Sequence, residues 1–175
     1  MQTAVMPETD SGREFSAFYR EWFDRVYNYA RNRTGSVTRA DEIVSDTFNR
    51  VLDCWDSFDP FKGDRRTWLF SIAFRAVADH YRSETRRKWV TLGFASEPIE
   101  PPPARGFEAA EEHRRLAAAL QTLTPEHREI VSLKFYGGLT NRAIAKLMGL
   151  TEANVGVIVF RSVRRLRELL LGKGS

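Results

Sequence analysis

The sequence predicts an all-α fold with two small helical domains. Apolar residues recur every three to four positions in several separate stretches, which is the period of helices that bury one face. No stretch alternates apolar and polar residues over a useful length, as a half-buried strand would. With 175 residues and 42% hydrophobic content, the chain can bury real cores, but each of two domains would be near the lower size limit for independent stability.

Prolines mark the boundary between the two domains. The stretch between Val90 and Phe107 lacks helical periodicity and contains Pro98, Pro101, Pro102 and Pro103. Proline has no amide donor and favours extended backbone, so this stretch is typical of a linker. We therefore expect a disordered leader at 1–12, a first domain at 13–89, a linker at 90–110 and a second domain at 111–171.

The first domain should contain three or four helices. The first helix ends near Gly35 and carries an aromatic-rich stripe of Phe15, Phe18, Tyr19, Trp22, Phe23, Val26 and Tyr29. Thr38, with Asp41 three residues later, is expected to cap the second helix. The stripe of that helix comprises Ile43, Val44, Thr47, Phe48, Val51, Leu52 and Trp55. Residues 58–64 break helicity. The third helix then carries Trp68, Leu69, Ile72, Ala73, Ala76, Val77, His80 and Tyr81.

Residues 139–170 are typical of a helix-turn-helix. Ile144 and Ala145 fall on the inner side of a first helix. Gly149 can adopt the left-handed turn conformation, and Thr151 can cap a second helix. The buried stripe of the second helix is Val155, Ile158, Val159, Ser162, Val163, Leu166 and Leu170. Such a unit presents a helix to the major groove of DNA. A plain helical hairpin within a bundle is the alternative.

Charge is distributed unevenly along the chain. From Arg114 to the end, eleven basic and four acidic residues give +7, so the rest of the chain carries −3 of the total of +4. This asymmetry suggests two modules with different electrostatic partners. The basic module suits a polyanion such as DNA.

Several features argue against membrane, metal and enzyme functions. Cys54 is the only cysteine, so the chain cannot form an internal disulfide, which fits a reducing compartment. No apolar run approaches membrane-spanning length, and the start of the chain lacks a signal-peptide core. We expect a cytoplasmic protein without membrane insertion. His80, His113 and His127 are isolated from one another, and neither a phosphate loop nor a nucleophile elbow is present. We expect no metal, no cofactor and no enzymatic activity.

Two segments resemble the conserved regions of bacterial RNA polymerase sigma factors. The segment 40–87, ADEIVSDTF…YRSETRR, is similar to region two, and the segment 120–169, LQTLTPEHR…RRLREL, is similar to region four. Their order and the proline-rich divider resemble the compact extracytoplasmic-function (ECF) type of the sigma-70 family, which keeps only these two regions. The resemblance implies a factor that binds core RNA polymerase and directs promoter-specific initiation by recognising and melting promoter DNA. Such factors are commonly held inactive by an anti-sigma factor.

The resemblance implies a contact with core polymerase. In the family, the helix that bears the ADEIVSD-type motif docks on the clamp helices of the largest polymerase subunit. The matching residues are Asp41, Glu42, Val44, Asp46, Phe48 and Arg50. Carboxylates beside aliphatic groups suit an interface with a polar rim and an apolar centre. A solvated acidic face over a core stripe is the alternative for some of them, and Phe48 is expected in the core.

The next segment is implied to engage the minus-ten promoter element. Drawing a base out of the duplex costs about a few kcal/mol, which a protein can offset by stacking the base and clamping the phosphates. The loop offers Phe58, Phe61, Lys62, Arg65 and Arg66, and the following helix offers Arg75, Asp79, His80, Arg82 and Arg86. The loop and Arg75 are the first candidates, with Arg75 either reading a base or holding a phosphate. Trp68 is expected to be mainly structural.

Region four is implied to read the minus-thirty-five element as a duplex. Phosphate contacts are expected where the first helix begins, at Thr140, Asn141 and Arg142. The second helix should face base edges with Glu152, Ala153, Asn154, Gly156 and Val157, and the DNA backbone with Arg161, Arg164 and Arg165.

Three positions of the second helix depart from the family pattern. Gly156, Val157 and Ile158 stand where related proteins usually carry lysine or arginine, serine and arginine. Gly156 also weakens the helix by about 1 kcal/mol relative to alanine. Asn154 is the best remaining candidate for base readout, because its amide can pair bidentately with adenine. We therefore expect shallow discrimination, with each upstream base substitution costing less than about 1 kcal/mol.

Two other functions remain open. A stand-alone helix-turn-helix regulator would explain the second half of the chain but leaves the first half without a purpose. A scaffold that binds polymerase without melting DNA is the other alternative. Val157 and Phe160 could also serve an interface with an anti-sigma factor.

Overall fold

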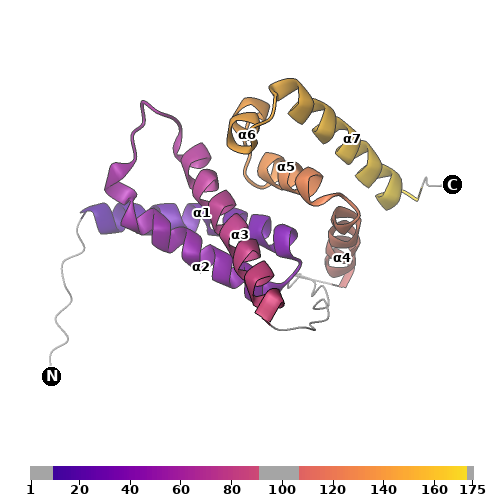
Figure 1. Cartoon of the computed structure of the whole chain (residues 1–175), viewed down its shortest axis with the longest axis horizontal. Coiled ribbons are helices and arrows are strands. Elements are labelled where there is room, and N and C mark those ends of the chain that lie inside the picture. The colour runs from indigo at the N-terminus through magenta and orange to yellow at the C-terminus, as the bar shows by residue number, and fades with distance from the viewer. Residues whose placement is uncertain (1–9, 91–106, 173–175) are drawn as a thin grey trace.

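The computed structural model describes residues 10–90 and 107–172 (Figure 1). Within these ranges the chain contains helices and turns and no strand, which confirms the all-α prediction. The elements are α1 (Asp10–Thr34), α2 (Val37–Asp53), the short 3-10 helix η1 (Trp55–Ser57), α3 (Arg65–Val90), α4 (Phe107–Gln121), α5 (Pro125–Phe135), α6 (Asn141–Met148) and α7 (Glu152–Leu170). Most of the expected leader and linker, at 1–9 and 91–106, lies outside the described residues.

Helices extend slightly beyond the domain boundaries that the sequence suggested. Helix α1 begins at Asp10, inside the expected leader, and α4 begins at Phe107, inside the expected linker. The start of α4 reads FEAAEE, and alanine and glutamate are strong helix formers, so the helix begins as soon as the prolines end.

Helices α1, α2 and α3 form the first module. They bury the predicted stripes, with Val26, Tyr29, Ile43 and Val77 almost fully enclosed. Gly35 ends α1 with a left-handed φ of 70°.

The cap of α2 differs from the prediction. It is Ser36, whose side chain accepts a hydrogen bond from the Arg39 amide, and not Thr38. Ser36 follows Gly35 and has extended backbone, as an N-cap residue does. The helix therefore begins at Val37, and Thr38 already lies in its first turn.

Helices α4 to α7 form the second module. Thr124 caps α5 by accepting a hydrogen bond from the His127 amide, and Pro125 occupies the first turn, where its missing donor has no consequence. Arg128 joins α5 to the end of α4, because its guanidinium donates to the backbone carbonyls of Leu120, Gln121 and Leu123.

Helices α6 and α7 form the predicted helix-turn-helix. Gly149 has a φ of 71°, and the Thr151 side chain accepts a hydrogen bond from the Asn154 amide. The chain bends by 109° between the two helices, which is the range of a helix-turn-helix and not of an antiparallel hairpin. Among residues 10–90 and 107–172, no single helix is long and apolar enough to span a membrane, and α6 and α7 meet that test only as a bent pair.

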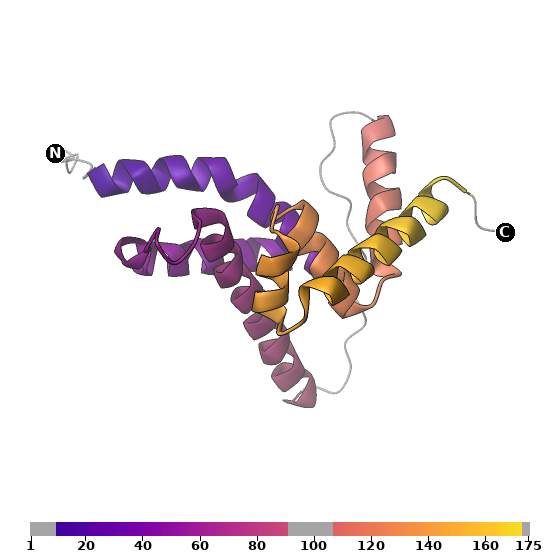
Figure 2. The same ribbon diagram turned by 90° about the horizontal axis from the view of Figure 1, so that it is seen from above.

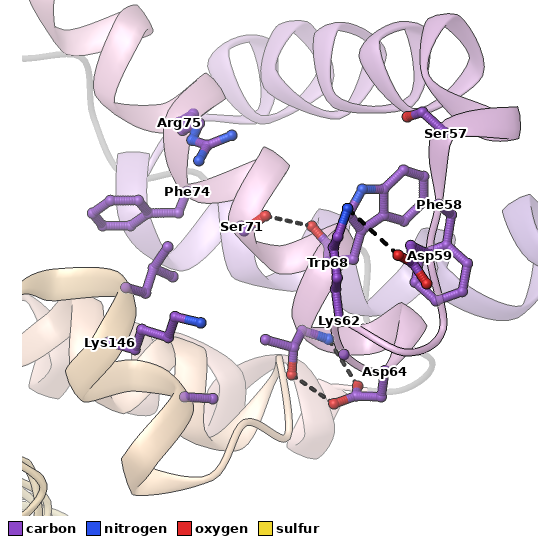
Figure 3. A pocket seen from close by; sticks show the side chains of 14 residues that line it. Ser57, Phe58, Asp59, Lys62, Asp64, Trp68, Ser71, Phe74, Arg75 and Lys146 are labelled. Carbon is purple, nitrogen blue, oxygen red and sulfur yellow. Dashed lines mark hydrogen bonds and ion pairs between the residues drawn. The ribbon is translucent and has the colours of Figure 1, made fainter.

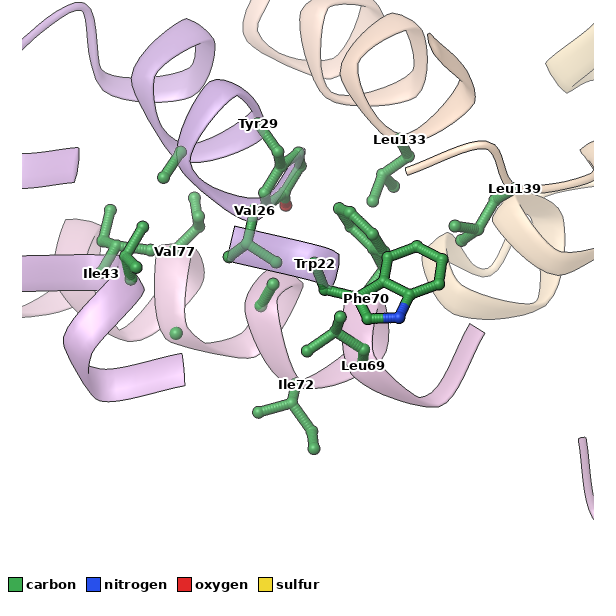
Figure 4. Packing of buried hydrophobic residues seen from close by; sticks show 14 of the residues in the cluster. Trp22, Val26, Tyr29, Ile43, Leu69, Phe70, Ile72, Val77, Leu133 and Leu139 are labelled. Carbon is green, nitrogen blue, oxygen red and sulfur yellow. The ribbon is translucent and has the colours of Figure 1, made fainter. Parts of the chain in front are cut away.

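The two modules share one hydrophobic core. A continuous cluster runs from α1 and α3 through α5 into the helix-turn-helix. Figure 4 shows Trp22 and Phe70 of the first module facing Leu133 and Leu139 of the second. Figures 1 and 2 show the second module resting against the C-terminal part of α1. A smaller cluster, around Leu120 and Leu166, belongs to the second module alone.

Replacing Gly156 with alanine is expected to raise the free energy of unfolding by about 1 kcal/mol, because alanine has the higher helix propensity. The added Cβ would meet only the Asn141 side chain at 3.5 Å, which is ordinary van der Waals contact. Urea denaturation of the full chain measures the change. Gly149→Ala is the matched control and should destabilise, because Gly149 has a positive φ. An unchanged or lower midpoint for Gly156→Ala would contradict the expectation.

Candidate functional site

The candidate polymerase surface lies on the exposed side of α2. Asp41 and Glu42 are exposed, and Asp46 and Arg50 are partly exposed. Val44 does not belong to this surface: it is 4% exposed, because the helical period turns it into the core beside Ile43 and Phe48. Phe48 is buried as predicted.

One exposed apolar residue of α2 was missed. Leu52 was expected in the buried stripe of α2 but is 53% exposed near the end of the helix. The stripe alone could not indicate this, because a stripe does not show where the neighbouring helices stop covering it. Leu52 is therefore an exposed aliphatic side chain on the helix that carries the candidate polymerase contacts.

A charge network joins α2 to α3. Arg50 bonds Asp46 at 2.8 Å and Asp79 at 2.9 Å, and Asp79 also accepts from Arg82 at 3.2 Å. Nδ1 of His80 lies 3.7 Å from a carboxylate oxygen of Glu42. Asp79 and His80, which the sequence suggested as minus-ten contacts, therefore lie against the candidate polymerase surface. The two candidate sets therefore meet at Asp79, His80 and Arg82.

The loop before α3 packs an aromatic cluster. Trp68 lies against Phe58 and Trp55, with ring centroids 5.2 and 6.4 Å away. The Arg65 guanidinium lies over the Trp55 and Phe58 rings. Trp68 is thus structural as expected, and Phe58 and Arg65 are partly engaged in the same packing.

Phe61 is the free aromatic side chain of the loop. It is 98% exposed, and its backbone amide donates to Asp59, which holds the turn. The neighbouring Lys62 is exposed and lies 3.4 Å from the Asp59 carboxylate. Of the aromatic residues predicted to meet the minus-ten element, Phe61 is the one available for stacking.

A pocket of about 430 Å³ opens beside this loop (Figure 3). Phe58, Lys62 and Arg75 line it from the first module, whereas Lys146 and Leu147 line it from α6 of the second. Asp64 also lines the pocket and accepts hydrogen bonds from the amide and the hydroxyl of Thr67 at the start of α3. Burial would raise the pKa of Asp64, but these hydrogen bonds outweigh it and hold the pKa below its usual value.

Three further arginines of the minus-ten set differ in their surroundings. Arg66 lies over the Trp22 ring and donates to the carbonyl of Gly138 at 3.2 Å, so it contacts the second module. Arg82 is exposed on α3. Arg86 lies on α3, but its side chain is outside the described residues.

Helix α6 begins with residues that are already engaged. The Thr140 side chain accepts from the Ala143 amide, and Asn141 accepts from Lys134 at 2.9 Å. Arg142 is exposed and lies 3.5 Å from Glu152 at the start of α7. Arg142 is therefore the most available phosphate contact among the three that the sequence suggested.

The outer side of α7 presents the predicted recognition residues. Glu152, Ala153, Asn154 and Val157 are exposed, and Gly156 is partly exposed. Ile158 is buried, so it is not available to contact DNA. Further along, Arg161, Arg164 and Arg165 are exposed, with Arg164 paired to Glu168 at 3.0 Å.

An apolar patch follows the recognition residues on α7. Val157 is 45% exposed and Phe160 is 69% exposed, three residues apart on the same helix. An exposed phenylalanine beside a valine suits contact with another protein or with the thymine methyl group.

The arrangement matches known protein families. The sigma-70 region 2 model matches residues 18–87, and the sigma-70 region 4 model matches residues 113–166. The chain belongs to the sigma-70 family. Its relatives are ECF RNA polymerase sigma factors: BldN of Streptomyces coelicolor is 32% identical over 97% of this chain, and SigK of Mycolicibacterium vanbaalenii is 28% identical over 89%. The chain spans 65% of the length of BldN and 81% of SigK. The family resemblance drawn from the sequence is confirmed.

Two solved structures share the fold of this sigma factor. The sigma factor RpoE in complex with the anti-sigma factor NepR from Bartonella quintana has a TM-score of 0.74 and 21% identity, covering 90% of this chain and 97% of that chain. CnrH in complex with the cytosolic domain of CnrY has a TM-score of 0.66 and 25% identity, covering 93% of this chain and 90% of that chain. Both likenesses extend over both modules.

Proposed function

We propose that this sigma factor binds core RNA polymerase and directs promoter-specific initiation of transcription. The observation that carries the proposal is the presence of both sigma regions in order, each with its candidate contact residues on the surface. The first module, 10–90, acts as region two and the second, 107–172, as region four. RNA synthesis belongs to the polymerase, so the sigma factor needs no metal, cofactor or catalytic residue of its own and works in the cytoplasm.

The α2 surface is the proposed polymerase contact. Asp41, Glu42, Asp46 and Arg50 supply its polar rim, and Leu52 adds exposed apolar area near the end of the same helix. This combination suits a protein interface better than a purely solvated acidic face would. Arg50 also forms an ion pair with Asp79 of α3. Polymerase binding at α2 would therefore affect the position of α3, the helix that follows the minus-ten loop.

We propose that the loop before α3 separates the DNA strands at the minus-ten element. Phe61 offers an exposed ring on which an extruded base can stack, and Lys62 and Arg75 offer positive charge for the phosphates. On α7, Asn154 is the base reader and the exposed arginines hold the backbone. The burial of Ile158 supports shallow discrimination at the upstream element, because it removes one position from base contact.

We also propose regulation by an anti-sigma factor. Both structural neighbours are bound to such a factor or to the cytosolic domain of a partner protein. The exposed pair Val157 and Phe160 is the surface on this chain that an apolar helix of such a partner would cover.

Reconstitution with core polymerase and promoter DNA tests the proposed function. The wild-type protein should start specific transcripts only when polymerase is present and should leave duplex DNA unprotected on its own. A stand-alone regulator would instead protect an operator without polymerase. A scaffold would bind polymerase without starting transcripts.

Replacing Phe61 with alanine is expected to lower open-complex formation on duplex promoter by about 5- to 100-fold, the worth of one stacked base. The defect should shrink on a template whose minus-ten region is already unpaired. Permanganate footprinting of unpaired thymines measures both. Phe135→Ala removes another exposed phenylalanine, on α5, and should leave melting unchanged. Equal melting by wild type and Phe61→Ala would contradict the assignment.

A further inference from the structure

The pocket beside the minus-ten loop is lined by both modules. Phe58, Lys62 and Arg75 of the first module line it together with Lys146 and Leu147 of α6 (Figure 3). Helix α6 opens the helix-turn-helix, so region four lies over the loop that is proposed to melt DNA.

This closeness does not fit a promoter. Elements centred ten and thirty-five base pairs upstream are about 25 base pairs apart, which is about 85 Å along straight duplex at about 3.4 Å per base pair. Two small modules that share one pocket and one hydrophobic core lie too close together to hold both elements at once. The modules must separate before this sigma factor spans a promoter. The 16 residues between Val90 and Phe107 can reach at most about 55 Å, which allows a large separation.

Apolar contacts hold the modules together. Leu133 and Leu139 of the second module pack into the cluster that contains Trp22 and Phe70 of the first (Figure 4). Phe70 and Leu133 are completely buried. Opening would expose these side chains to water, which opposes separation.

A buried polar cluster lies in the same interface, and we call it the latch: Tyr29 and Arg33 of α1 with Glu129 of α5. The Tyr29 hydroxyl and Arg33 Nε each donate to a different carboxylate oxygen of Glu129, both at 2.6 Å. The Arg33 and Glu129 side chains are 8% and 6% exposed. Arg33 also donates to the carbonyl of Pro125, at the first turn of α5.

The surroundings keep the latch in its bonded form. Burial and the Glu129 carboxylate hold the pKa of Tyr29 well above its usual value, so the hydroxyl keeps its proton and remains a donor. Burial raises the pKa of Glu129, while Arg33 and the Tyr29 hydrogen bond oppose that rise. Tyr81 fixes Arg33 from the other side, because its hydroxyl donates to the Arg33 carbonyl and its ring lies under the guanidinium.

We infer that the free sigma factor rests in this closed form, which cannot occupy a promoter, and that the Tyr29–Arg33–Glu129 latch holds it closed. The contacts between the modules are sufficient to describe the closed form. The statement that this form cannot occupy a promoter rests on the proposed function. A buried charge that loses its partner strongly destabilises the protein. The modules should therefore be either fully closed, with the latch intact, or fully separated, with Arg33 and Glu129 in water. Promoter or polymerase binding must supply the free energy that separates the modules.

Charge reversal of the full chain tests the latch. Arg33→Glu and Glu129→Arg each place like charges together, and the double variant restores opposite charges. Small-angle scattering should give the wild type a radius of gyration near the value for a compact chain of its length, about 16 Å. Both single variants should be clearly larger at unchanged helix content by circular dichroism, and the double variant should return toward the wild type.

Matched controls separate the latch from charge alone. Arg114→Glu and Glu111→Arg make the same changes in an exposed ion pair on α4 and should leave the radius unchanged. If the single latch variants lose their helices, Tyr29→Phe decides, because it removes only one hydroxyl and should still expand the chain measurably. Single variants and Tyr29→Phe that stay as compact as the controls, or a wild type that is already expanded, would overturn the proposal.

Promoter occupancy by reconstituted holoenzyme provides a second readout. The concentration of sigma factor that gives half-maximal occupancy should fall about tenfold or more in both single variants, because the open fraction rises. Arg33→Glu makes the protein more negative and Glu129→Arg makes it more positive. If the variants acted only through attraction to DNA, their half-maximal concentrations would shift in opposite directions, which would contradict the latch. A wild type that starts no transcripts would refute the proposed function and leave the scattering result standing. A working wild type with unshifted variants would refute only the latch.

Discussion

Replacing Phe70 with alanine is expected to lower the free energy of unfolding by about 3–5 kcal/mol, because it removes a fully buried aromatic side chain and leaves a cavity. Phe70 meets Trp22 and Tyr29 edge-on, with ring centroids 6.4 and 5.6 Å away. It also belongs to the cluster that holds Leu133 and Leu139 of the second module. Urea denaturation followed by circular dichroism measures the loss.

The shape of the unfolding curve gives a second observable for Phe70. Because both modules share this core, the wild type should unfold in one cooperative transition, and Phe70→Ala should separate the unfolding of the two modules. Phe135→Ala, at an exposed position, should change stability by less than about 0.5 kcal/mol. A loss for Phe70→Ala no larger than that of Phe135→Ala would contradict the burial of Phe70, and separate transitions of the two modules in the wild type would contradict a shared core.

Replacing Gly137 with alanine is expected to destabilise the protein by about 1–3 kcal/mol through overpacking. An added Cβ would lie 2.5 Å from the carbonyl oxygen of Leu133, 2.8 Å from Leu139 Cδ1 and 3.2 Å from Phe70 Cδ1. The nearest of these atoms belongs to the backbone, so the strain cannot be relieved by turning a side chain. Thermal unfolding measures the change.

Gly156→Ala is the natural comparison for Gly137→Ala, because it adds the same methyl group where space is available. The two variants should move the melting temperature in opposite directions. The segment at 137–139 also contacts Phe70 and Arg66 of the first module, so Gly137→Ala should expand the chain in solution as well. A melting temperature equal to that of the wild type would disprove the steric argument.

Local patterns predicted the helix-turn-helix closely. The positions of Gly149 and Thr151 depend on backbone chemistry that acts over a few residues, namely the left-handed turn and the capping hydrogen bond. The same kind of reasoning failed at Thr38, because two nearby residues, Ser36 and Thr38, can both cap a helix. Which one does so depends on where the preceding turn at Gly35 places the chain.

The exposure of individual residues was predicted less well, because a sequence motif does not show which side of a helix packs against the neighbouring helices. The family resemblance assigns Val44 to the polymerase contact, yet packing places it in the core. Ile158 is buried, as its position in the stripe of the second helix predicted. Leu52 shows the reverse error, since its stripe position suggested burial and the structure exposes it.

The contact between the modules could not be predicted. Arg33 and Glu129 are 96 residues apart in the sequence, and each resembles an ordinary charged residue of a helix. Glu129 stands directly before the apolar residues Ile130 and Val131, which is a weak sign of burial. Its partner is set by three-dimensional packing, and the proline-rich divider gave no indication that the domains would touch.

The shared core has a consequence for chimeric proteins. Exchanging one half of this chain for a half that lacks the matching residues would set Phe70 against foreign side chains and leave either Arg33 or Glu129 without its partner. A hybrid that keeps both sigma regions intact would therefore have altered coupling between them. Promoter specificity and the ease of activation could not be transferred separately in such a hybrid. Each contact that joins the modules needs one residue from each half of the chain.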